Sequence, residues 1–95
     1  MGVDELIGNK RAAILDLARK YGAYNVRVFG SVARRDARPD SDVDFLVDVQ
    51  PHVGMEFLSL WTALEDLLGR DVDLVTERSL HDYLREQVLR EAVLL

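Results

Sequence analysis

The sequence contains no cysteine, which excludes disulfide bonds, thiolate zinc sites and cysteine nucleophiles. No run of apolar residues approaches the roughly 18 that a membrane-spanning helix needs, and the first residues lack the pattern of a signal peptide. Basic residues are also few, because 12 Lys and Arg stand against 17 Asp and Glu, for a net charge of −5. Since phosphate backbones are held by clustered basic residues, a direct nucleic-acid binder is not expected. We predict a cytoplasmic protein that does not enter a membrane.

The remaining composition is that of an ordinary globular protein. Hydrophobic residues make up 48% of the chain and charged residues 31%, which rules against a disordered chain. A length of 95 residues allows one hydrophobic core and little more. We therefore expect residues 1–95 to form a single domain.

The spacing of apolar residues predicts three longer helices. The first extends from Asp4 to about Tyr21, with Gly22 placed to end it. The second covers Phe57 to Leu68 and is closed by Gly69. The third begins at the capping box of Ser79 and Asp82 and continues to about the end of the chain.

Three shorter segments, Val26–Phe29, Asp42–Val49 and Val72–Thr76, have the residues and the alternation of strands. Ser31 is positioned to cap a brief helix over residues 32–34, and residues 37–41 and 51–54 read as loops. The order of elements predicts an α/β (α+β) fold, a small mixed β-sheet flanked by helices. In the second strand, one face carries Val43, Phe45, Val47 and Val49, and the other carries Asp42, Asp44, Leu46 and Asp48.

Carboxylates inside these apolar strands are the first candidate site residues. Asp42 and Asp44 leave the same face of a strand, with Cα atoms roughly 6.6 Å apart. Asp73 would join them if its strand pairs beside the Val43 strand. Because crowded carboxylates repel one another, a divalent cation is the natural partner, and ligands that are all oxygen favour Mg²⁺.

The dipeptide Gly30-Ser31 offers the second candidate feature, a place for an anion. Glycine lets the backbone approach a phosphate closely, and serine at a helix start brings a hydroxyl and exposed amide hydrogens. Taken singly, each residue has a simpler interpretation, since Gly-Ser is a common turn and Asp42 could merely end a strand. Residues with only a structural interpretation are Asp48 and Asp71, expected at solvated strand ends, and His52 and His81, expected on the surface.

The complete motif resembles a known signature. The run from Gly30-Ser31-Val32-Ala33-Arg34 to Ser41-Asp42-Val43-Asp44-Phe45 is similar to that of the DNA polymerase β-like nucleotidyltransferase superfamily. The resemblance is strongest to its minimal (MNT) members, which are antitoxins beside HEPN-domain ribonuclease toxins. It includes the segment around Asp73 and the stretch from Leu84 to Ala92, so it covers nearly the whole chain.

The resemblance implies the nucleotidyltransferase fold and transfer of a nucleoside monophosphate from a nucleoside triphosphate, with release of pyrophosphate. For an antitoxin of this type, the donor is ATP, the cofactor is Mg²⁺ and the acceptor is a tyrosine of the HEPN toxin. Such a type VII-like antitoxin silences its toxin by AMPylation and is expected to form a hetero-oligomer with it. A partner must supply the acceptor, because the chain has no second domain to hold one.

Matched residue by residue, the resemblance implies that Gly30 and Ser31 hold the triphosphate and that Asp42 and Asp44 bind magnesium. Asp73 would complete the metal and catalytic set and accept the proton of the attacking hydroxyl. Arg34 matches the family pattern and would neutralise phosphate charge, with a solvated helix arginine as the alternative. The family often has glycine at the next position, where this chain has Arg35, so a backbone approach there is in doubt.

Two alternatives from other functional classes stay open. The chain could bind its toxin and block it without catalysis. It could also be the catalytic subunit of a small-molecule nucleotidyltransferase that works with a helical accessory chain. The first alternative predicts that a variant unable to transfer AMP still neutralises the toxin. The second predicts that label from ATP is found only on small molecules.

Overall fold

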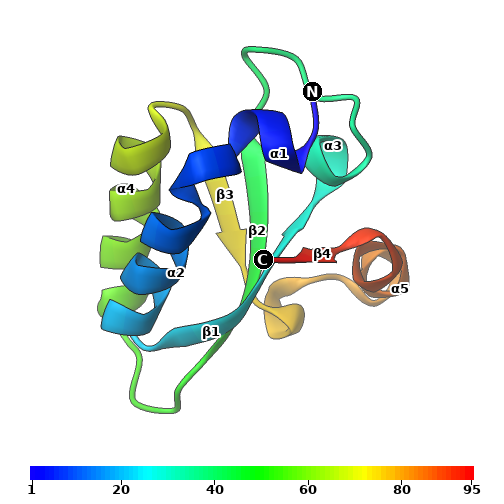
Figure 1. Ribbon diagram of the computed structural model, residues 1–95. Coiled ribbons are helices and arrows are strands. Elements are labelled where there is room, and N and C mark those ends of the chain that lie inside the picture. Colours follow the sequence, from blue (N-terminus) through cyan, green and yellow to red (C-terminus); the bar gives the residue numbers. More distant parts are fainter.

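A largely buried strand lies at the centre of the structure. In the computed structural model, which describes residues 1–95, β2 (Val43–Val49) has antiparallel β1 (Ala23–Phe29) on one side and parallel β3 (Val72–Val75) on the other. The short β4 (Val93–Leu94) pairs antiparallel with β1 and gives the strand order β3-β2-β1-β4. The predicted mixed sheet flanked by helices is confirmed (Figure 1).

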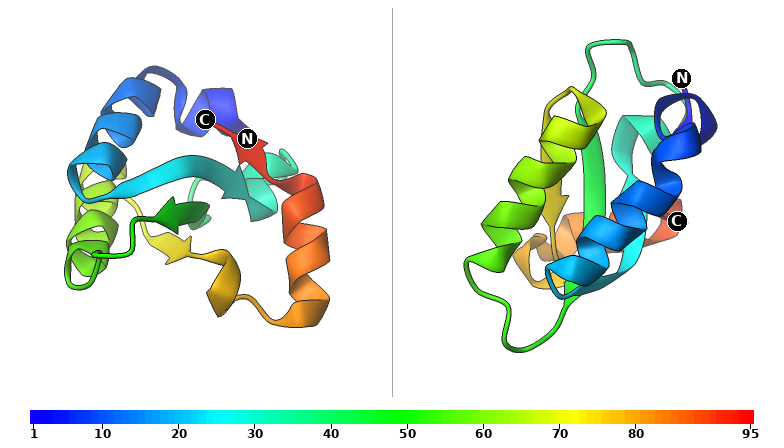
Figure 2. Two further views of the ribbon diagram at one scale, coloured as in Figure 1. Left: turned by 90° about the horizontal axis from the view of Figure 1, so that it is seen from below. Right: turned by 60° about the vertical axis from the view of Figure 1, so that its left-hand side comes forward.

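The helices divide between the two sides of this sheet. α2 (Arg11–Lys20) and α4 (Glu56–Leu68) lie side by side on one face, and α5 (Asp82–Glu91) stands on the opposite side (Figure 2). Between α2, α4 and the sheet lies a core of 16 buried residues. Its fully buried members include Ile14, Val28, Phe45 and Leu64.

The face of the sheet turned toward α5 also has a buried apolar residue, and so does α5 itself. Leu46, which alternates with the aspartates of β2, is 0% exposed, and Val88 of α5 is 7% exposed. Neither residue belongs to the main core. The acidic face of β2 is thus covered rather than solvated at its middle, which is where the α5 side of the molecule packs.

The predicted N-terminal helix is interrupted. A short α1 (Val3–Leu6) is followed by a 3₁₀ turn, η1 (Gly8–Lys10), before α2 begins. Gly8 has a φ of +37°, which no α-helix interior accommodates. The prediction of one helix from Asp4 to Tyr21 is therefore wrong at this glycine, although α2 ends as expected just before Gly22, where φ is +81°.

The C-terminal helix also differs from its prediction. The capping box links Thr76 and Ser79 on a 3₁₀ turn, η2 (Glu77–Ser79), and α5 begins at Asp82 without a side-chain cap. The helix stops at Glu91, because Ala92 turns to extended backbone and the chain continues as β4. The predicted helix to the end of the chain is replaced by a helix and an edge strand.

The other predicted boundaries hold to within a few residues. β1 begins three residues earlier than predicted, through a bulge at Asn25, where φ is +51°. β2 begins at Val43, so Asp42 lies just before it. α4 ends at Gly69 in the left-handed conformation, as predicted. None of the helices combines the length and the apolar character needed to cross a membrane.

Candidate active site

Two of the three candidate aspartates are neighbours across the parallel pair of strands. The register places Asp44 of β2 opposite Asp73 of β3, so that the two side chains leave the same face of the sheet. Asp42 stands two residues before Asp44 and is exposed. The condition set by the sequence, that the Asp73 strand pairs beside the Val43 strand, is met.

Among the three aspartates, Asp44 is the one whose negative charge is disfavoured by its surroundings. Burial raises the pKa of Asp44 from 3.8 to about 6, and the negative charges of Asp73 and Asp42 add to the effect. The nearby Arg34 lowers this pKa but does not offset the other causes. The site therefore holds more negative charge than its own cations neutralise.

The oxygens of Asp42, Asp44 and Asp73 are free to bind other groups. None of the three side chains forms an ion pair, and none accepts a hydrogen bond from the protein. Their oxygens also do not close into a cage that could hold a metal ion unaided. Such a donor set fits a hard cation that takes its remaining ligands from water and substrate phosphates.

A tight turn brings the Gly30-Ser31 dipeptide against these carboxylates. β1 ends at Phe29, and Gly30 opens the four-residue α3 (Gly30–Ala33) with a φ of +71°. A Cβ at Gly30 would collide with the carboxylate of Asp44, so only glycine fits between the turn and β2. Ser31 lies in the first turn of α3 and makes no side-chain capping bond, which corrects its predicted role as a cap.

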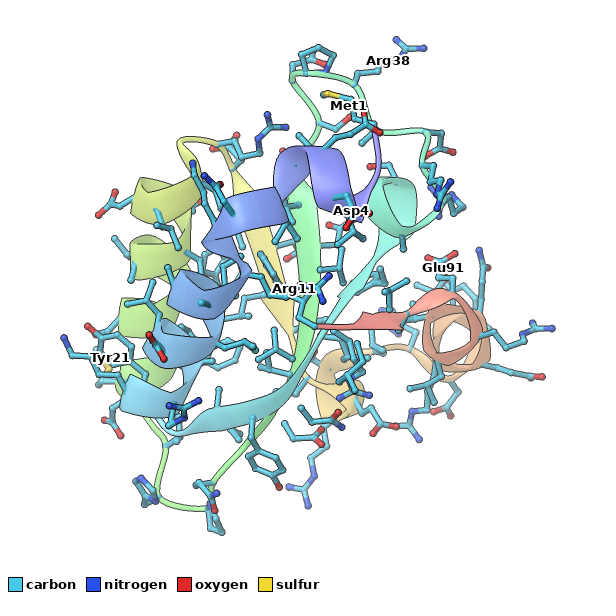
Figure 3. The ribbon with its side chains drawn as sticks, viewed as in Figure 1. Met1, Asp4, Arg11, Tyr21, Arg38 and Glu91 are labelled. Atoms are coloured by element: carbon cyan, nitrogen blue, oxygen red, sulfur yellow. The ribbon has the colours of Figure 1, made fainter.

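The backbone amide of Gly30 already has an anionic partner that the sequence did not reveal. Gly30 N–H donates to Oε1 of Glu91 at 2.9 Å, and Nη1 of Arg34 lies 3.3 Å from both oxygens of the same carboxylate. Nε of Arg34 also donates to Asp36 at 3.4 Å. Figure 3 shows Glu91 on α5, on the side facing α3. The hydrogen bonds that Arg34 donates to Glu91 and Asp36 raise the pKa of its guanidinium.

One signal in the sequence could have drawn attention to Glu91. It occupies the last turn of α5, where a carboxylate meets the negative end of the helix dipole. An acidic residue in that position is unfavourable unless a cation or an amide elsewhere binds it. Its partners are 57 and 61 residues away, so the local pattern could not identify them.

A pocket of about 420 Å³ joins these features. The sheet and α3 contribute Asp44, Asp73, Gly30, Ser31 and Arg34 to its wall. Phe29 and Val75 of the sheet also line it. The remaining lining residues are Leu80 and, from α5, Leu84, Gln87, Val88 and Glu91.

The remaining candidates lie outside this pocket. A larger pocket of about 620 Å³ at the other end of β2 contains none of the candidate site residues. Asp48, at its edge, is not a solvated strand end as predicted, because it pairs with Arg27 at 3.1 Å. Asp71, His52 and His81 are exposed, as predicted.

Arg35 has a φ of +67°, the left-handed backbone that glycine adopts without strain. This is the position at which the chain departs from the motif that its sequence resembles. Arg35 therefore adopts a backbone conformation that would suit a glycine at this position.

Comparison with known proteins gives the geometry a family context. Residues 10–95 match the nucleotidyltransferase domain family. The chain is 43% identical over 79 residues to the protein adenylyltransferase MntA of Thermococcus cleftensis, which covers 82% of this chain and 80% of that protein. It is 32% identical over 94 residues to a Methanocaldococcus jannaschii protein provisionally assigned as a protein adenylyltransferase, which covers 98% and 97%.

Solved structures show the same architecture. One that is described as a minimal nucleotidyltransferase superposes with a TM-score of 0.86 at 50% identity, covering all of this chain and 97% of that one. A second, a toxin-antitoxin crystal structure with AMP-PNP, superposes with a TM-score of 0.74 at 27% identity and covers 90% and 71%.

Proposed function

Because this chain belongs to the nucleotidyltransferase family and is a nucleotidyltransferase, we propose that it is a protein adenylyltransferase that acts as the antitoxin of a toxin-antitoxin pair. The observation that carries the proposal is the register of Asp44 and Asp73 beside the Gly30 turn, which unites an acidic pair with an anion-binding backbone. The names of the relatives support the choice of a protein as the acceptor.

In this proposal, the triphosphate of ATP lies along α3. Gly30 and Ser31 offer backbone amides and a hydroxyl, and Arg34 offers a guanidinium to the phosphate oxygens. Asp42, Asp44 and Asp73 would hold Mg²⁺, which would supply positive charge to the phosphates. The raised pKa of Asp44 supports this assignment, because the carboxylates need a counter-charge that the protein does not supply.

The chemical step is an in-line displacement. The oxygen of the acceptor hydroxyl forms a bond to the α-phosphorus of ATP, while the bond from that phosphorus to the bridging oxygen of pyrophosphate breaks. Asp73, at the outer side of the acidic pair, accepts the proton of the hydroxyl. The residues of the chain contribute position and charge, which supply most of the catalysis in phosphoryl transfer.

The acceptor in this proposal is a tyrosine hydroxyl of a HEPN-domain ribonuclease toxin, with which the chain forms a hetero-oligomer in the cytoplasm. Asp42 is exposed and lies outside the pocket that contains Asp44 and Asp73, so a partner can approach the aspartates from solvent. One structural neighbour is a toxin-antitoxin complex that holds an ATP analogue, which supports a partner of this class.

Transfer of label tests the proposal. The chain is incubated with Mg²⁺, ATP labelled at the α-phosphate and a candidate HEPN toxin. We expect label on the toxin, its loss with EDTA and its loss in the double variant Asp42→Asn/Asp44→Asn, with Asp40→Asn as the matched control. A Tyr→Phe substitution at the labelled position of the toxin should also abolish the signal.

Two other outcomes would replace the proposal. Neutralisation of the toxin that survives in the double variant would identify an antitoxin that works by occlusion. Label found only on small molecules would identify a subunit of a small-molecule nucleotidyltransferase.

A further inference from the structure

Glu91 occupies two of the hydrogen-bond donors that the proposed function gives to the triphosphate. Its carboxylate accepts the N–H of Gly30 at 2.9 Å and lies 3.3 Å from Nη1 of Arg34 through both oxygens. We propose that Glu91 is a built-in competitor for the nucleotide, which holds the phosphate-binding turn closed until a triphosphate displaces it. This inference rests on the proposed function and adds an autoinhibitory contact to it.

The competition follows from the number of donors at the turn. Gly30 has a single backbone N–H, and an amide hydrogen that bonds a carboxylate at 2.9 Å is not available to a phosphate oxygen. Arg34 is in a similar state, because its Nη1 faces Glu91 and its Nε faces Asp36. The amide of Gly30 and two nitrogens of Arg34 are therefore engaged before any nucleotide arrives.

Charge makes the competition stronger. Asp44, Asp73 and Glu91 all line the pocket, and Arg34 is the only cationic side chain among its lining residues. A triphosphate that entered while Glu91 stayed in place would meet three carboxylates and one guanidinium that is already paired. Withdrawal of Glu91 exchanges one anion for another at Arg34 and removes one of the three carboxylates that repel the triphosphate.

The contact is built so that Glu91 can leave. Its side chain is 17% exposed, so it reaches the turn from the rim of the pocket and not from the core. It lies in the last turn of α5, where the helix dipole disfavours its charge, and the bonds to Gly30 and Arg34 compensate for this. The chain beyond it is held by the two-residue β4 and by one further bond, from Leu95 N–H to the carbonyl of Val26 at 2.9 Å.

The test compares two substitutions on the same helix. Glu91→Gln removes the competing charge, while Glu86→Gln removes a charge that is exposed and makes no hydrogen bond. Binding of the ATP analogue AMP-PNP with Mg²⁺, in the absence of any toxin, is measured by isothermal titration calorimetry. We expect Glu91→Gln to bind about tenfold more tightly than the wild type (~1.4 kcal/mol) and Glu86→Gln to bind as the wild type does.

An unchanged or weakened affinity of Glu91→Gln for the nucleotide would overturn the inference. Weaker binding is the result expected if Glu91 merely positions Arg34. If Glu91→Gln does not fold, as judged by circular dichroism, Glu91→Asp decides in its place. That variant retains the charge but shortens the reach by one methylene, so tighter binding is again expected and unchanged or weaker binding overturns the proposal.

A second readout follows the turn itself. In ¹H–¹⁵N spectra, the amide of Gly30 should shift in Glu91→Gln and on addition of AMP-PNP to the wild type. A ¹³C carboxyl signal of Glu91 that stays unchanged when the nucleotide binds would also overturn the inference.

Failure of the proposed function gives a different result. If Glu91→Gln binds nucleotide more tightly but no AMP is transferred to any toxin, the role of Glu91 as a competitor is supported and the adenylyltransferase proposal is contradicted. If neither the wild type nor Glu91→Gln binds nucleotide, both the proposed function and the role of Glu91 are contradicted.

Discussion

Replacement of Asp44 by asparagine should stabilise the metal-free protein while it removes a proposed metal ligand. The pKa of Asp44 is raised from 3.8 to about 6, which at ~1.4 kcal/mol per pH unit corresponds to an ionisation cost of about 3 kcal/mol in the fold. The side chain is half-buried, so solvent screening reduces the expected gain to about 1–2 kcal/mol. Asparagine has nearly the same shape, and the carboxylate makes no hydrogen bond that would be lost.

The sign of the effect depends on pH. Because the pKa is higher in the folded than in the unfolded state, the cost is present in full above pH 6 and disappears as the pH falls toward 3.8. Wild type and Asp44→Asn should therefore differ at pH 7.5 and converge near pH 4. At neutral pH, the melting temperature of the variant should be roughly 5–10 °C higher.

Urea unfolding in EDTA measures the difference, followed by the fluorescence of Trp61, the single tryptophan. Asp40→Asn is the matched control, because this aspartate is exposed and makes no ion pair. An Asp44→Asn variant that is equally or less stable than the wild type at pH 7.5 would refute the electrostatic reasoning. A stabilisation that persists at pH 4 would show that packing, not charge, is its cause.

Two further substitutions test the turn that follows β1. Gly30→Ala forces a Cβ into the Asp44 carboxylate at a φ of +71°, and should cost about 1–3 kcal/mol in thermal unfolding, whereas Gly54→Ala, which meets no atom within 4 Å, should have little effect. Arg35→Gly relieves left-handed strain and should raise the free energy of unfolding by up to about 1 kcal/mol, while Arg35→Ala, which keeps the Cβ, should not. Equal stability of Gly30→Ala and Gly54→Ala would contradict the first account. Equal stability of Arg35→Gly and Arg35→Ala would contradict the second.

The elements that the sequence predicts well are those whose pattern is local and repeated. Strict alternation located β2, helical spacing with a terminal glycine located α4, and the two together implied a mixed sheet. The adjacency of Asp44 and Asp73 required one further assumption, that β3 pairs beside β2, which the parallel register fulfils. For these residues, local chemistry and the final fold agree.

The misses lie where a long-range contact decides the conformation. Helical spacing could not predict that α5 ends at Glu91, because the strand that follows is defined only by its pairing with β1. The same holds for Glu91 itself, whose partners belong to α3 and the residue after it. At the other end, the break at Gly8 depends on one residue that a helical pattern tolerates in most contexts.

The edge strand β3, which carries Asp73, is bonded to α4 through its first residue, Val72. Trp61 of α4 donates its indole N–H to the carbonyl of Val72 at 2.6 Å, and Glu65 accepts the amide of Val72 at 3.2 Å. The spacing between the two strand aspartates is thus coupled mechanically to a helix on the far face of the sheet. A ligand or antibody that tilts α4 would act allosterically, altering the geometry of the acidic pair from a distance and without entering the pocket.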